Sequence, residues 1–188
     1  MKKTMSALLS VLLLVGLVFN ASAGTSISSS GSSSSNAGIK DFLFSEMKDG
    51  IGCGVCPVYT APSLNAFRAN DGKATCATDY PLFIAGFNPE GWLLVRYSTN
   101  SGSTRVGYIP PSYVKGFSSS KRISFSYVQA TAASSLYVTD NPMNNYSAFA
   151  VLDPGEAYYI LGSYTYYGNW WYIECTVDGL VARGFIEK

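Results

Sequence analysis

The sequence offers few side chains that could carry out chemistry, and its 188 residues contain no histidine. A serine or cysteine nucleophile therefore has no imidazole to take its proton, and a catalytic zinc ion has no histidine ligand. A hydrolase would need a Ser–Lys pair or two carboxylates instead. The carboxylates fall in expected turns, where turn formation is their ordinary role: Asp71, Asp79, Glu90, Asp153, Glu156 and Asp178. We therefore expect no enzyme, no cofactor and no metal.

The four cysteines are the next candidates for chemistry. Cys53 and Cys56 have the spacing of half a zinc ribbon, but Cys76 and Cys175 stand too far apart in sequence to supply the second half. The same pair has the spacing of a redox motif, without the βαβ pattern that accompanies one. An even number of cysteines in an exported chain favours disulfide bonds. We expect one bridge, from Cys76 to either Cys53 or Cys56, and a free Cys175.

Export is predicted from the N-terminus. Lys2 and Lys3 precede an apolar run over residues 7–19, and the small residues Ala21-Ser22-Ala23 follow it. This order is typical of a signal peptide over residues 1–23 that is cleaved after Ala23. An uncleaved anchor is the alternative. Cleavage removes two of 13 basic residues and leaves 11 against 12 acidic ones, so no basic surface for nucleic acid is expected. The mature protein is expected to be secreted or cell-wall associated, without a membrane partner.

The elements that would position any site come from an internal repeat. Residues 156–186 contain three apolar runs separated by turns, which predicts a small antiparallel meander, and residues 81–109 follow the same order. Trp92 matches Trp170, Val95 matches Ile173, and Gly107-Tyr108-Ile109 matches Gly184-Phe185-Ile186. The chain therefore contains two copies of one β module.

The rest of the chain is divided by composition. Residues 24–38 are Ser- and Gly-rich and predict a disordered tether, and residues 39–52 predict an N-terminal arm, with a short amphipathic helix as an alternative. The modules span residues 53–114 and 123–188, joined by a linker over residues 115–122. With about 60 residues each, the modules need dense aromatic packing, and the chain supplies 14 Tyr, 10 Phe and 3 Trp.

The second module resembles the bacterial SH3 (SH3b) domain in the segments SSLYVTDNP, YSAFAVLDPGEAYYILG, NWWYIECTVDG and ARGFI. The first resembles a variant of that family in APSLNAFRANDGKATCATDY, PLFIAGF, GWLLVRY and RVGYIPPS. Together the segments cover roughly residues 53–187. The resemblance implies an all-β fold of two tandem SH3-like small barrels after a short N-terminal arm or helix. It also implies binding to peptidoglycan or its peptide stems.

Binding is expected in aromatic grooves, as SH3-like barrels bind extended peptides. The candidate ligand-binding residues are Tyr59, Phe67, Tyr80, Trp92, Tyr108, Tyr137, Tyr146, Tyr166, Tyr167, Trp170 and Trp171. Core packing is the competing role, above all for Trp92, Tyr108, Trp170 and Phe185. In GSYTYYGNWW, strand alternation places Trp170 and Trp171 on opposite faces, so at least one of them should be partly exposed, together with Tyr164, Tyr166 and Tyr167. A cluster of this size usually marks a contact site or an interface between modules.

The leading hypothesis is an exported, non-catalytic protein that binds cell-wall peptide or glycan. The alternative is a structural or protein-interaction role, in which the barrels pack on each other or on a surface protein and the linker or arm fills the grooves. A hydrolase would require clustered ionisable groups in one cleft, and no such group is apparent from the sequence.

Overall fold

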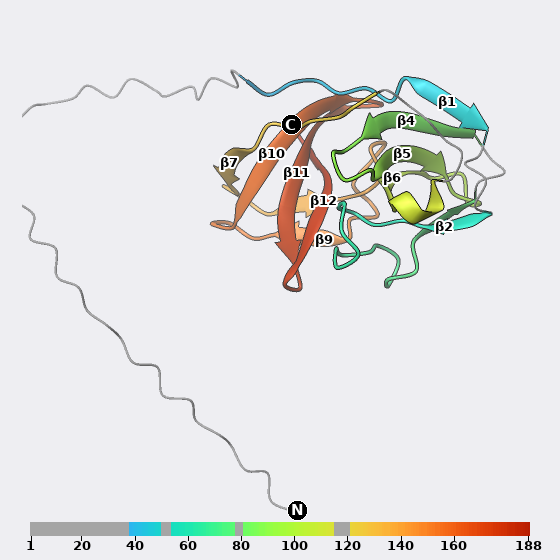
Figure 1. Ribbon diagram of the computed structural model, residues 1–188. Coiled ribbons are helices and arrows are strands. Elements are labelled where there is room, and N and C mark those ends of the chain that lie inside the picture. Colours follow the sequence, from blue (N-terminus) through green and yellow to red (C-terminus); the bar gives the residue numbers. More distant parts are fainter. Residues whose placement is uncertain (1–37, 50–53, 78–80, 115–120) are drawn as a thin grey trace, which may run out of the picture. The chain divides into compact units, whose positions relative to one another are not determined.

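Short β-strands make up the fold in the computed structural model of the protein (Figure 1). The structure describes residues 38–49, 54–77, 81–114 and 121–188. The predicted signal peptide, the tether up to residue 37, Cys53, Tyr80 and most of the linker lie outside these residues. Within the described residues there is no α-helix, and so none long and apolar enough to cross a membrane.

The first repeat combines a four-stranded and a two-stranded antiparallel sheet. The four-stranded sheet has the order β1-β4-β5-β6, and the small sheet pairs β2 with β3. The bounds are β1 (Glu46–Asp49), β2 (Val55–Pro57), β3 (Thr75–Ala77), β4 (Pro81–Phe87), β5 (Leu93–Ser98) and β6 (Thr104–Ile109). A short 3₁₀ turn (Pro111–Tyr113) follows, because Pro110 and Pro111 cannot donate ladder hydrogen bonds.

The second repeat has the same construction, with a four-stranded sheet ordered β12-β11-β10-β7 and a small sheet of β8 and β9. The bounds are β7 (Val128–Thr131), β8 (Leu136–Val138), β9 (Ala150–Leu152), β10 (Ala157–Thr165), β11 (Asn169–Val177) and β12 (Leu180–Glu187). The long strands β10 and β11 alternate buried and exposed side chains over part of their length, as expected for strands with one covered face.

Strand register shows that the repeats correspond at the bulge and in the pairing of their central strands. A bulge interrupts β4 between Ile84 and Gly86 and β10 between Ile160 and Gly162. Val95 pairs with Gly107 as Ile173 pairs with Gly184. These are the pairs that the sequence comparison matched, so the predicted internal duplication is present in the sheets.

The two sheets of each repeat meet at an isolated bridge, Tyr59 with Tyr108 and Thr139 with Phe185. A glycine is required beside each bridge because another chain segment passes close by. A Cβ on Gly107 would lie 2.4 Å from Val58 Cγ1, and one on Gly184 would lie 2.8 Å from the Thr139 carbonyl oxygen.

Each repeat is preceded by an extended arm that pairs with the other repeat. Arm 1 (residues 38–44) forms a parallel bridge from Asp41 to Ser163 of β10. Arm 2 (residues 121–125) forms the equivalent bridge from Arg122 to Phe87 of β4. The bulge glycines allow this approach, since a Cβ on Gly86 would lie 2.9 Å from the Lys121 carbonyl oxygen and one on Gly162 would lie 3.2 Å from that of Lys40. The repeats therefore exchange arms.

The exchange produces a core that both repeats share. One buried cluster combines Trp92, Leu94 and Tyr108 of the first repeat with Trp170 and Phe185 of the second. Phe42 of arm 1 enters this cluster, with its ring centroid 5.2 Å from that of Tyr164. By its contacts, the chain from Asn36 to Lys188 forms one compact unit.

The all-β class is confirmed, and the helical alternative for the N-terminal arm is wrong. Residues 39–45 are extended and continue into β1, because backbone hydrogen bonds from Phe42 to Ser163 and from Ser163 to Lys40 hold the arm along a strand. Among the described residues, the strand pairings do not run round into a closed barrel. Each repeat consists of two open sheets joined by a bridge.

Candidate functional site

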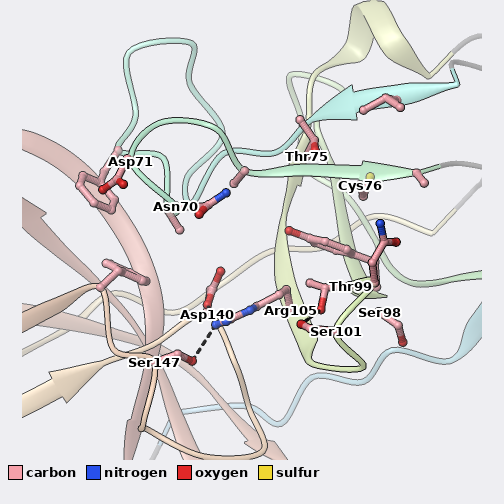
Figure 2. Close-up of a pocket in the computed structure, with 18 of the residues that line it drawn as sticks. Asn70, Asp71, Thr75, Cys76, Ser98, Thr99, Ser101, Arg105, Asp140 and Ser147 are labelled. Carbon is pink, nitrogen blue, oxygen red and sulfur yellow. Dashed lines mark hydrogen bonds and ion pairs between the residues drawn. The ribbon is translucent and has the colours of Figure 1, made fainter.

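A hollow of about 950 Å³ lies where three segments of the first repeat face a loop of the second. The segments from the first repeat are the loop between β2 and β3 (residues 58–74, the first loop), β3 itself, and the β5–β6 hairpin. The segment from the second repeat is the loop between β8 and β9 (residues 139–149, the second loop). We call this space the first hollow (Figure 2).

An ion pair between the repeats lies in the wall of the first hollow. Arg105 of β6 lies 2.5 Å from the Asp140 carboxylate and donates a hydrogen bond of 2.8 Å to Ser147. Figure 2 shows its guanidinium between these two groups. Asp140 is nearly buried, and desolvation raises the pKa of its carboxyl above the ordinary 3.8, while the positive charge of Arg105 opposes the rise. The pair thus joins the repeats and places both signs of charge in the wall.

Cys76 and Tyr97 form a buried part of the same wall. Burial raises the pKa of the Cys76 thiol to about 12, so the thiol stays protonated at neutral pH. Burial likewise raises the pKa of the Tyr97 hydroxyl above its ordinary 10. Neither group is activated as a nucleophile, and this wall is suited to contact rather than to covalent chemistry.

The rim is rich in hydroxyl and amide groups. Asn70 and Asp71 stand in a tight turn of the first loop with φ of 55° and 51°, a left-handed conformation that Asn and Asp adopt more readily than most residues. Across from this turn, Thr99 Oγ1 lies 2.9 Å from Ser101 Oγ at the tip of the β5–β6 hairpin. Thr75, Ser98 and Asn100 also line the hollow. These side chains offer both donors and acceptors to a polar ligand.

An aromatic pair closes one side of the first hollow. Phe67 of the first loop stacks on Phe149 of the second loop, with ring centroids 5.3 Å apart. The backbone N–H of Phe67 also donates to the Val181 carbonyl of β12 at 2.9 Å. The first loop is therefore fixed to the second repeat, and the hollow has an apolar wall beside its polar rim.

The equivalent positions in the second repeat have different chemistry. Strand register places Cys175 where the first repeat has Tyr97, and Ala182 where it has Arg105. Leu152 likewise takes the place of Cys76. All three are buried and belong to an apolar cluster. The polar wall is thus particular to the first repeat.

The aromatic residues singled out from the sequence do not gather in one groove. Trp92, Tyr108 and Trp170 are buried core side chains, as their competing role in packing predicts, so they are not accessible to a ligand. Tyr59, Phe67, Tyr166 and Trp171 are partly buried, while Tyr137, Tyr146 and Tyr167 are exposed. Of these, only Phe67 lines the first hollow, and Tyr80 lies outside the described residues.

The tyrosine-rich hairpin between β10 and β11 forms part of the interface between the repeats. Tyr164 is buried and accepts a hydrogen bond of 2.7 Å from Arg96 of β5. The same guanidinium lies 4.2 Å from the centroid of the Tyr166 ring. Trp170 is buried and Trp171 partly exposed, which agrees with the predicted alternation. The prediction of partial exposure is wrong for Tyr164, which is buried against the first repeat, and it is confirmed for Tyr166 and for Tyr167, which is 77% exposed.

The disulfide expected at Cys76 is absent, and that prediction is wrong. Cys76 lies directly opposite Cys56 in the β2–β3 ladder, but Cys56 is disulfide-bonded while Cys76 is a free thiol. Cys175 is free and buried, as expected. Cys53 lies outside the described residues.

Sequence reasoning missed the residues that give the first hollow its polarity. Arg105 and Asp140 are 35 residues apart and belong to different repeats, so no local pattern joins them. For Asp71, the sequence predicts only a role in a turn. A usable signal lay in the repeat comparison, since Arg105 stands where the second repeat has alanine.

Comparison with known proteins gives no family for this chain. No family model matches it, and no curated protein or solved structure gives a significant match. Among the described residues, no group of three or more Cys, Asp or Glu side chains is placed to hold a metal ion. The candidate site therefore rests on the geometry of the first hollow.

Proposed function

We propose that this protein is an exported, non-catalytic binding protein of two SH3-like repeats, and that it holds a cell-wall glycan in the first hollow. The observation that carries the proposal is the combination of a polar rim, an Arg–Asp pair and a stacked aromatic pair around one space of about 950 Å³. Binding sites typically combine apolar walls with a few placed polar groups in this way.

A glycan suits these walls better than a peptide does. Sugar hydroxyls both donate and accept hydrogen bonds, which matches the mixed donors and acceptors of Asn70, Thr75 and Thr99. The C–H faces of sugar rings pack on aromatic rings, which Phe67 and Phe149 supply. The proposal also draws on the secretory leader expected at residues 1–23 and on the resemblance to SH3b domains, which implies a cell-wall ligand.

A retention assay on purified, insoluble cell walls tests this proposal. Thr75→Trp places a bulky ring in the wall of the first hollow and is expected to reduce retention at least tenfold by excluding the ligand. Val151→Trp is the matched control, because Val151 takes the equivalent position in β9, is exposed, and does not line the hollow. Equal retention of the two variants would contradict the site.

The ligand class is tested with walls whose peptide stems have been removed by an amidase. Retention of the unmodified protein on these stripped walls is the expected result, because the glycan strands remain. Loss of retention would assign the ligand to the peptide stems and overturn the glycan proposal.

A structural role is the second candidate, favoured by the way aromatic residues fill the space between the repeats. Phe42 of arm 1 packs against Tyr164, Tyr172 and Phe185, so this part of the interface is occupied by the chain itself. Absence of retention on any wall preparation, with the fold intact, would favour this role.

A further inference from the structure

A second hollow, of about 480 Å³, lies beside residues 61–65 of the first loop. Ala61, Pro62, Ser63 and Asn65 of that loop form one wall, and the β11–β12 hairpin forms the opposite wall. Like the first hollow, it therefore lies between the two repeats.

A backbone hydrogen bond joins the linings of the two hollows. Phe67 lines the first hollow and Val181 lines the second, and the Phe67 N–H donates to the Val181 carbonyl at 2.9 Å. The first loop is braced at this point, since the Phe67 carbonyl accepts hydrogen bonds from the N–H and the hydroxyl of Thr60. A segment fixed by hydrogen bonds thus lies between the two hollows.

Each hollow carries one Arg–carboxylate pair. Arg105 and Asp140 stand in the first, and Arg183 donates to the Glu174 carboxylate at 2.8 Å in the second. In each pair one partner keeps more than a fifth of its side chain exposed, namely Arg105 at 22% and Glu174 at 21%. The accessible member differs between the hollows: Arg105 offers a donor in the first, and Glu174 offers an acceptor in the second, while Arg183 is buried and donates to Glu174, Tyr108 and Tyr127. Sugar hydroxyls can pair with either group, because they both donate and accept hydrogen bonds.

From the adjacency of the two hollows and the partly exposed charged group in each, we infer that they are successive subsites for one linear glycan strand that passes across the first loop. The inference rests on the proposed function and adds the form of the ligand: an extended polymer bound along its length, not a terminal group or a single sugar. A strand that occupies both hollows gains the second set of contacts without a second association step, so its affinity exceeds that for either hollow alone.

The test uses peptide-free glycan strands released from the same walls and sorted by length, with affinity measured by isothermal titration. For the unmodified protein, affinity is expected to rise by roughly a hundredfold once a strand spans both hollows, which is the lower end for linked sites. Asn65→Trp, in the wall of the second hollow, is expected to abolish this gain and to leave binding of the shortest strands unchanged.

Leu64→Trp is the matched control. Leu64 is the adjacent residue of the same loop, is 68% exposed and lines neither hollow, so its variant is expected to keep the length dependence. Asn65→Arg is a second variant that blocks the second hollow, in case the indole ring of Asn65→Trp disturbs the loop. Near-UV circular dichroism verifies the fold of the two Asn65 variants and of Leu64→Trp.

The outcomes separate this inference from the proposed function. Affinity that is independent of strand length in the unmodified protein, or a length gain kept in both Asn65 variants, would overturn the two-subsite inference and leave binding in the first hollow standing. Failure of strands of every length to bind would instead overturn the proposed function itself.

Discussion

At the scale of single residues, the pair of Arg105 and Asp140 determines how the protein responds to pH near the site. Burial favours the protonated form of Asp140, and Arg105 opposes this effect. Arg105→Ala removes the opposing charge and raises the pKa of Asp140 further. The variant is expected to lose about 3 kcal/mol of unfolding free energy at pH 7, because it leaves the buried Asp140 carboxylate without its partly exposed partner.

The sign of the pH dependence follows from linkage. A carboxyl with a raised pKa binds its proton more tightly in the folded state, so its favourable contribution is present below pH 3.8 and is lost as pH rises through the folded-state pKa. Urea denaturation should therefore show the deficit of Arg105→Ala shrinking from pH 7 to pH 4. Adding Asp140→Asn should flatten this trend, and a deficit that stays constant with pH would contradict the account.

The roles of individual side chains could be predicted where they depend on local pattern. The alternation of Trp170 and Trp171 and the buried state of Cys175 follow from strand geometry and residue type. The pairing of Cys56 could not be predicted, because four cysteines allow three connectivities and the choice depends on three-dimensional placement. For the same reason the sequence gives no indication that Arg105 contacts Asp140.

At the scale of elements, the exchanged arms carry much of the interaction between repeats. Phe42→Ala should remove ring contacts with Tyr164, Tyr172 and Phe185 and destabilise the fold by about 3 kcal/mol, a typical cost for truncating a packed phenylalanine. Leu43→Ala, at the neighbouring exposed position, should change stability by less than about 0.5 kcal/mol. Urea denaturation of both variants measures the difference, and equal effects would show that the arm contributes little.

The strands themselves were largely predictable, whereas the arms were not. Apolar runs separated by turn residues located β4 to β6 and β10 to β12, because each of these strands covers a core with part of its side chains. Residues 39–48 have an apolar spacing that also fits a helix. The arm is extended because it pairs with Ser163. Ser163 lies in the other repeat, so this pairing cannot be predicted from the sequence of the arm.

At the scale of the whole molecule, the two repeats are expected to fold as one cooperative unit. Each contributes side chains to the shared cluster, and each four-stranded sheet receives the arm that precedes the other repeat. The Arg183 side chain donates a buried hydrogen bond of 2.7 Å to the Tyr108 hydroxyl across the interface. A domain of about 60 residues is close to the lower limit for a stable core, so neither repeat is expected to stay folded without the contacts that the other supplies.

Separating the repeats tests this cooperativity. Residues 36–118 and 119–188 produced as two fragments should each lack the dispersed amide NMR spectrum of a folded β protein, because in each fragment one sheet loses its arm and the shared cluster is exposed. Mixing the fragments should restore the dispersed spectrum, since each fragment then supplies the arm that the other needs. A dispersed spectrum from either fragment alone would show that this repeat folds independently. The arm that it lacks would then connect two stable domains without being needed for their folding.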